Sequence, residues 1–141
     1  MLLYLWYNSE VNHALPRQNP IDVDDLLKNW EDVYKKGLLT FWVLLFLHER
    51  PAYAYELSPA IAELSQGTIV ADDNSLYRAL NRFESLGIVD SELRQSEVGP
   101  QRRYYRLTEA GTDLLARFIR RNILVFEKPA IAERIQAVAA P

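Results

Sequence analysis

The sequence contains no cysteine among its 141 residues. Disulfide bonds, thiolate metal sites and cysteine nucleophiles are therefore excluded, and the composition fits a reducing compartment. The longest apolar run, residues 37–47, is well short of the roughly 18 residues that a membrane-spanning helix needs. Residues 1–7 lack the basic start of a signal peptide. We therefore expect a cytoplasmic protein that does not bind a membrane.

Motifs for catalysis are also missing. The chain has no glycine-rich phosphate loop, no nucleophile elbow and no paired-histidine motif. Its two histidines are too few, and too far from any acidic cluster, to indicate a metal site. We therefore predict that the protein is not an enzyme and that it needs neither a metal nor another cofactor.

Positive charge is scarce overall, because the formal net charge is −3. That balance argues against a protein that coats nucleic acid without sequence preference. Residues 74–141, however, carry eleven basic and eight acidic side chains, and all but one of the basic ones are arginine. Arginine makes forked contacts with phosphates and guanine edges. We therefore expect a positively charged face on an otherwise acidic protein.

Two helices are predicted in the first third of the chain. In residues 20–36 the apolar side chains recur at spacings of three and four, which gives one continuous apolar stripe. That stripe either covers the chain's own core or contacts a second subunit, and the pattern fits both equally. Gly37 is expected to interrupt the helix, and residues 38–48, apolar nearly all round, predict a helix at the centre of a domain.

The rest of the chain predicts helices on either side of a hairpin. Pro59 is expected to kink or restart the first of these helices. The expected elements are helices at 53–64 and 75–85, strands at 88–94 and 102–107, a helix at 109–127 and a last short helix after Pro129. This order predicts a mainly α fold with a small β-hairpin (α+β), namely a winged helix-turn-helix with additional N-terminal and C-terminal dimerisation helices.

This architecture divides the chain into three predicted parts. Residues 1–36 form an N-terminal extension with an amphipathic helix, residues 37–110 form the winged helix-turn-helix DNA-binding domain, and residues 111–141 form the C-terminal dimerisation helices.

The helix at 75–85 has the chemistry of a recognition helix. Asp72, Asp73 and Asn74 all precede it as candidate caps, and Glu84 is expected to cap or pair locally. An inner apolar stripe leaves polar side chains on the opposite face, where arginine can pair with guanine and asparagine with adenine. The residues that we expect to contact DNA are Ser75, Tyr77, Arg78, Asn81, Arg82, Arg102 and Arg103.

Their predicted roles differ. Arg78, Asn81 and Ser75 are expected to read bases, whereas Arg82 and two hairpin arginines hold phosphates. Tyr77 either contacts DNA or is a half-buried support, as tyrosines on short helices often are.

Two stretches of the sequence carry a family resemblance. Residues 76–87 read LYRALNRFESLG, and residues 99–111 read GPQRRYYRLTEAG. Together with Tyr55-Glu56-Leu57 and the apolar run that starts at Gly37, they resemble the PadR family of transcription regulators over about residues 36–120. The family's usual Gly-Thr before Leu-Tyr is Asn74-Ser75 here, and its usual proline after Leu-Tyr is an arginine.

The resemblance implies a homodimer, formed largely through the C-terminal helices, that binds double-stranded DNA at an inverted-repeat operator. It also implies a repressor that is released by a small aromatic or hydrophobic effector. Four aromatic side chains either line an effector cavity or are plain core: Trp30, Phe41, Trp42 and Phe118. The alternative function is a winged-helix module that binds other proteins without direct DNA contact, as the acidic net charge permits.

Overall fold

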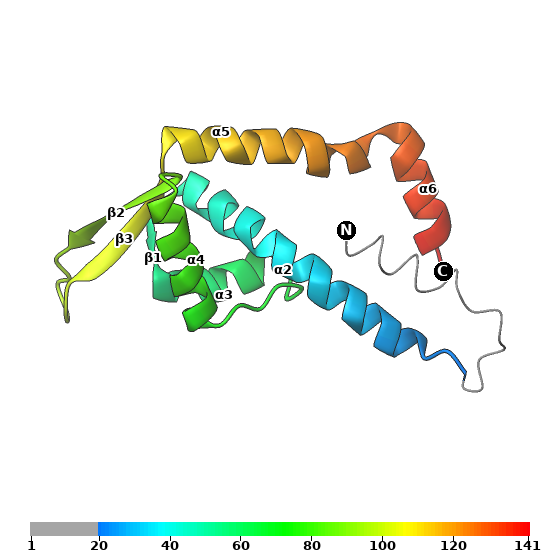
Figure 1. Ribbon diagram of the computed structural model, residues 1–141, viewed down its shortest axis with the longest axis horizontal. Coiled ribbons are helices and arrows are strands. Elements are labelled where there is room, and N and C mark those ends of the chain that lie inside the picture. The colour runs from blue at the N-terminus through cyan, green and yellow to red at the C-terminus, as the bar shows by residue number, and fades with distance from the viewer. Residues whose placement is uncertain (1–19) are drawn as a thin grey trace. The chain divides into compact units, whose positions relative to one another are not determined.

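The structure, a computed structural model, describes residues 20–141 (Figure 1). The described residues fall into two units, which divide between residues 33 and 34. The smaller unit contains the first part of helix α2 (Val23–Glu49). The Asp22 carboxylate begins this helix by accepting hydrogen bonds from the backbone N–H groups of Asp24 and Asp25. The helix therefore starts later than the prediction, which placed its first turn at Pro20.

Helix α2 continues through Gly37, so the predicted interruption at this glycine is wrong. A single glycine inside a helix costs only about 1 kcal/mol relative to alanine, and the long, straight-chain residues that flank it favour helix. Gly37 is exposed to solvent, and a Cβ atom added to it would lie more than 4 Å from any neighbouring atom. Although α2 has 27 residues, no helix between residues 20 and 141 is long and apolar enough to cross a bilayer.

The chain after α2 forms a short strand that the sequence pattern did not predict. Strand β1 (Ala52–Tyr53) comes directly before helix α3 (Ala54–Leu64). Two residues are too few for an alternating pattern to be recognised. Pro59 lies inside α3, as the sixth of its eleven residues, and the helix continues through it, so the predicted restart is wrong. The helix loses only the one hydrogen bond that residue 59 would donate to the carbonyl of Tyr55.

The winged helix-turn-helix fold is confirmed. Helix α4 (Asp73–Ser85) is followed by the hairpin of β2 (Val89–Arg94) and β3 (Arg102–Leu107), here called the wing. Strands β2 and β3 pair antiparallel, and β1 pairs antiparallel with the other edge of β3, which gives the strand order β1-β3-β2. The sheet therefore has three strands, whereas the sequence predicted two. The sheet and helices around α4 are seen together in Figure 1.

A continuous core lies beneath α4. The inner stripe predicted for this helix is buried, and Leu76 and Leu80 have no exposed surface. These side chains lie in one apolar cluster with the second half of α2, with α3 and with Tyr105 of β3. The outward direction of the remaining α4 side chains is therefore fixed by the burial of the inner ones.

The C-terminal helical stretch is less regular than predicted. Thr108 caps helix α5 (Glu109–Phe118), because its hydroxyl accepts the backbone N–H of Gly111. The predicted single helix to residue 127 is wrong: after α5 come a π-helical turn, η1 (Ile119–Ile123), and a 3-10 turn, η2 (Leu124–Glu127). Helix α6 (Pro129–Ala139) then begins with a proline in its first turn, where no backbone N–H is needed.

Candidate nucleic-acid interface

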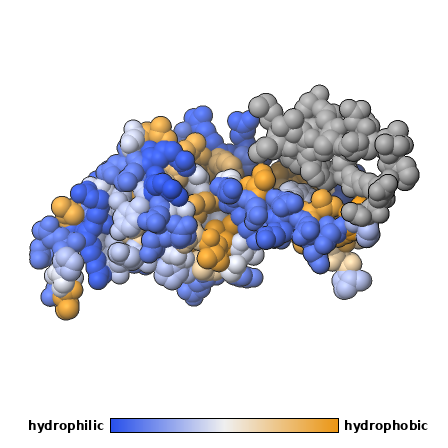
Figure 2. All heavy atoms as spheres, turned by 60° about the horizontal axis from the view of Figure 1, so that its bottom comes forward, coloured by the Kyte–Doolittle hydropathy of each residue, from blue (hydrophilic) through white to orange (hydrophobic). Residues whose placement is uncertain are grey.

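The outer face of α4 presents four of the predicted DNA contacts. Tyr77, Arg78, Asn81 and Arg82 are all exposed, and the exposed fraction of Tyr77 is 38%. They lie opposite the buried stripe of the same helix. Hydrophilic side chains also cover most of the neighbouring wing, at the left of Figure 2. The predicted direction of these four side chains is confirmed, whereas their contact with DNA remains a prediction.

A hydrogen-bond network, here called the cap network, links Asp72, Ser75 and Arg78 at the start of α4. Asp72 caps the helix by accepting the Ser75 backbone N–H at 2.8 Å and its hydroxyl at 2.9 Å. The Ser75 hydroxyl oxygen in turn accepts a bond from Arg78 at 3.4 Å. The Ser75 backbone bond, then its hydroxyl, lower the pKa of Asp72, with the Arg78 charge acting in the same direction. Because its hydroxyl serves the cap, Ser75 is less available to read a base than the sequence predicted.

The end of α4 is fixed to the wing by the backbone. Gly87 has a φ of 78°, and the N–H of Ile88 bonds the carbonyl of Phe83 at 3.1 Å, which closes the last turn. The Thr108 hydroxyl then donates to the Gly87 carbonyl at 2.7 Å. Because Thr108 follows β3 directly, these bonds set the position of the wing beside α4.

The two predicted wing arginines point to opposite faces of the sheet, because they are adjacent in β3. Arg102 stacks on the ring of Tyr53, with its guanidinium carbon 4.5 Å from the ring centre. Arg103 lies on the same face as Tyr105 and donates a hydrogen bond to the Ser91 hydroxyl at 3.0 Å. The wing therefore presents one of these arginines on each face.

The other two wing arginines are paired with carboxylates. Arg106 makes a two-pronged pair with Asp90, which raises the pKa of the arginine, and Arg94 bonds Glu92 at 2.7 Å. Within residues 20–141, Arg102 has no carboxylate partner and neither has Arg103. The charges of these two arginines are therefore not paired directly with a carboxylate, a difference that the sequence alone did not show.

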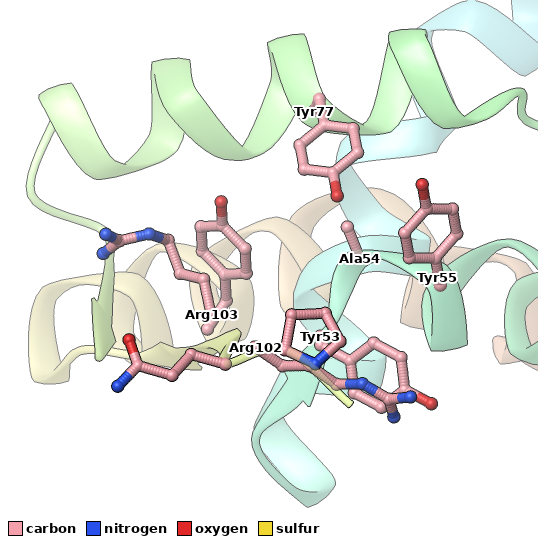
Figure 3. A pocket seen from close by; sticks show the side chains of 9 residues that line it. Tyr53, Ala54, Tyr55, Tyr77, Arg102 and Arg103 are labelled. Atoms are coloured by element: carbon pink, nitrogen blue, oxygen red, sulfur yellow. The ribbon is translucent and has the colours of Figure 1, made fainter. Parts of the chain in front are cut away.

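A hollow of about 370 Å³ lies between α4, the start of α3 and the wing. Figure 3 shows Tyr77 projecting from α4 toward Ala54 and Tyr55. Tyr55, 65% exposed, meets Tyr77 edge to face at 6.4 Å between ring centres. The sequence prediction missed Tyr55 as a member of this surface, although it is the tyrosine of the Tyr-Glu-Leu motif. The hollow is lined by Tyr53, Ala54, Tyr55, Tyr77, Pro100, Gln101, Arg102, Arg103 and Tyr105.

Three of the four predicted effector-binding residues come together away from this surface. Phe41 lies edge-on to Trp42 at 5.2 Å and beside Phe118 at 5.9 Å between ring centres. The indole N–H of Trp42 is buried and makes no hydrogen bond within the described chain. Trp30 belongs to the smaller unit and is 66% exposed. No group of three or more metal-ligating side chains occurs among the described residues.

Comparison with known proteins identifies the fold family. The model of the transcriptional regulator PadR-like family matches residues 43–117. A PadR family transcriptional regulator from Eggerthella lenta has a crystal structure that matches with a TM-score of 0.64 and 26% identity, over 84% of this chain and 96% of that one. The crystal structure of a PadR family transcription regulator from Clostridium difficile matches with a TM-score of 0.57 and 26% identity, over 70% of this chain and 99% of that one.

Two further similarities complete the comparison. An uncharacterized Lysinibacillus sphaericus protein is 25% identical over 85 residues, which cover 60% of this chain and 78% of that protein. Bacillus subtilis PadR, solved in complex with operator DNA, shares the fold with a TM-score of 0.56 and 18% identity, over 60% of this chain and 48% of that one. Since the family model covers more than half of the sequence, this chain belongs to the PadR-like family of transcriptional regulators.

Proposed function

We propose that the protein binds double-stranded DNA and acts as a dimeric transcriptional repressor. Each subunit sets α4 in a major groove and places the wing arginines on the adjacent phosphates. Arg78 and Asn81 read base edges, while Arg82, Arg102 and Arg103 hold the backbone. Ser75 and Tyr77 lie on the same surface, Ser75 mainly as the residue that holds Arg78.

One observation carries this proposal. The exposed polar face of α4 lies beside the two wing arginines that lack a carboxylate partner in the described chain. The B. subtilis relative, whose structure holds operator DNA, supports the same use of the fold. The net charge of −3 does not oppose it, because residues 89–107 of the wing carry four arginines and three acidic residues, and two of these acids, Asp90 and Glu92, are paired with Arg106 and Arg94.

A salt titration tests the DNA contact. Duplexes selected from a random pool by the purified protein should bind with an affinity that falls steeply as salt rises, because phosphate contacts release counterions. Arg102→Ala and Arg103→Ala should each lower the slope of log affinity against log salt by about 1. If no duplex is enriched at about 50 mM salt, the chain is instead a protein-interaction module.

The dimer belongs to the same proposal. Residues 111–141, the proposed dimerisation part, expose apolar side chains such as Leu124, Phe126 and Val138 within the described structure. The proposed N-terminal extension, residues 1–36, adds an exposed apolar stripe on the first part of α2, and its residues 1–19 lie outside the described residues. Sedimentation should give a dimer that Leu124→Glu weakens, while Leu93→Glu on the wing leaves it intact.

We assign the effector to the cluster of Phe41, Trp42 and Phe118 in the larger unit, while the role of Trp30 in the smaller unit stays a prediction. A buried indole N–H without a partner is costly, and an aromatic effector with an oxygen acceptor would satisfy it. Small aromatic acids and neutral aromatic compounds should be screened for release of bound DNA. Trp42→Phe, which replaces the indole by a smaller aromatic ring and removes the N–H donor, should weaken the response to an effector with an oxygen acceptor more than the response to one without.

A further inference from the structure

A second network, here called the wing network, links Glu84, Ser91 and Arg103 at the end of α4. We propose that Glu84 and Ser91 are positioning residues that hold the Arg103 guanidinium ready for a DNA phosphate. This inference rests on the proposed DNA binding. It assigns a role to two residues that themselves need not touch DNA.

The network crosses three elements. The Ser91 hydroxyl of β2 donates its hydrogen to the Glu84 carboxylate on the last turn of α4. The same hydroxyl oxygen accepts the bond from Arg103 of β3. Because Ser91 faces Tyr105 in the register, Ser91 and Arg103 are diagonal neighbours on one face of the sheet.

The direction of these bonds follows from the chemistry of a hydroxyl group. A serine has one hydrogen to donate and two lone pairs that accept. When Glu84 takes the hydrogen, the lone pairs of Ser91 are left for a donor, and Arg103 supplies it. The carboxylate therefore orients the serine, and the serine fixes the arginine.

Because Ser91 stands between Glu84 and Arg103, the charge of the arginine is not paired directly with a carboxylate. Arg106, on the opposite face of the wing, bonds the Asp90 carboxylate directly and is compensated by it. Arg103 makes one side-chain hydrogen bond within residues 20–141, to a neutral group, and a guanidinium has five N–H donors. Its remaining donors and its charge stay available for a phosphate.

Tyr105 lies next to both charged ends of the network. Burial raises the pKa of its phenol, the negative Glu84 raises it further, and the positive Arg103 lowers it. The two opposing influences on one side chain agree with the hydrogen bonds in placing both charges at this junction of α4 and the wing.

The test uses the full-length protein and a duplex selected by the wild type. Glu84→Ala gives the sharpest result, because removing a negative charge near DNA should strengthen binding if only net charge counts. We expect it to weaken binding instead, about 3- to 10-fold at 0.15 M salt, because Arg103 is no longer held. Ser91→Ala should weaken binding to a similar extent, whereas Glu84→Gln, which keeps an acceptor for the serine, should bind within about twofold of the wild type.

A double-mutant cycle and a matched control separate positioning from folding. In a protein that already carries Arg103→Ala, the change Ser91→Ala should lower DNA affinity no further, because Ser91 acts through the arginine. Ser96→Ala, a serine of the same wing that bonds only a backbone carbonyl, should leave affinity unchanged. If wild type binds but Glu84→Ala and Ser91→Ala bind equally well or more tightly, the inference is wrong. If the wild type selects no duplex, the proposed function itself fails.

Discussion

The two ends of α4 carry the same kind of network built in different ways. In each, a carboxylate accepts from a serine, and the serine accepts from an arginine that faces solvent. The cap network is local, since all its members lie within six residues of the chain. The wing network joins residues from α4, β2 and β3, and its longest link spans twelve positions.

This difference decides what each network depends on. The cap network forms as soon as the first turn of α4 forms, because Asp72 also caps the helix backbone. The wing network exists only when the hairpin is folded and fixed against α4 through Gly87 and Thr108. The first should therefore resist changes elsewhere in the domain, and the second should fail when the junction is disturbed.

The largest effect should follow a change at that junction. A Cβ on Gly111 would lie 2.0 Å from the Ile88 carbonyl oxygen, so Gly111→Ala must displace the start of α5 or the residue before β2. Overpacking of this kind typically costs on the order of 1 to 3 kcal/mol or more. We expect the melting temperature to fall by on the order of 10 °C and DNA affinity to fall with it.

Gly37→Ala is the matched control, because it adds the same methyl group to a glycine with open surroundings in α2. It should stabilise the protein by roughly 0.5 to 1 kcal/mol. If Gly111→Ala melted at or above the wild-type temperature, the close contact between α5 and the wing junction would not exist in solution.

The next effect concerns Arg78, the arginine of the cap network. Arg78→Ala should cost on the order of 1 to 3 kcal/mol in operator affinity and relax the preference at one base pair, because a bidentate contact with a base is lost. Arg103→Ala should instead lower the affinity for all DNA sequences to the same extent. Competition binding with single-base variants of the selected duplex measures both. An unchanged preference in Arg78→Ala would mean that α4 does not read the groove as proposed.

A smaller effect should follow removal of the cap itself. Asp72→Ala should lower the melting temperature by a few degrees, whereas Asp72→Asn should keep the cap, because asparagine accepts the same backbone bond. The native pKa of Asp72 is lowered, so its stabilising contribution is present above the ordinary value near 3.9 and is lost as the pH falls through the native pKa. Melting curves from pH 3 to pH 7 should show that the advantage of wild type over Asp72→Asn shrinks toward the acid end.

The sequence predicted the elements whose signals are local. The buried stripe of α4, the bounds of this helix and both strands of the wing were all placed within a few residues. Asp72 was one of three candidate caps, and only the structure selects it. These features are set by neighbours within one or two turns, which is the range that a residue pattern reports.

Features set by distant contacts were missed. Strand β1 is two residues long and exists because it pairs with β3, some fifty positions away. Gly37 was expected to interrupt a helix that continues, because the cost of one glycine is small beside the helix-favouring residues that flank it, and the restart expected at Pro59 does not occur. The division of the wing arginines into paired and unpaired ones depends on cross-strand partners that periodicity does not identify.

The smallest effect should come from the paired arginine on the opposite face of the wing. Arg106→Ala should lower DNA affinity by no more than about two- to threefold, because Asp90 already compensates this charge and the main change is that the Asp90 carboxylate loses its partner. Asp90→Asn keeps the size of the side chain but frees Arg106, and it should raise the affinity about two- to threefold at low salt and lose this gain as salt rises. The same salt titration measures both variants. A fall in affinity for Arg106→Ala as large as that for Arg103→Ala would remove the distinction between paired and unpaired arginines.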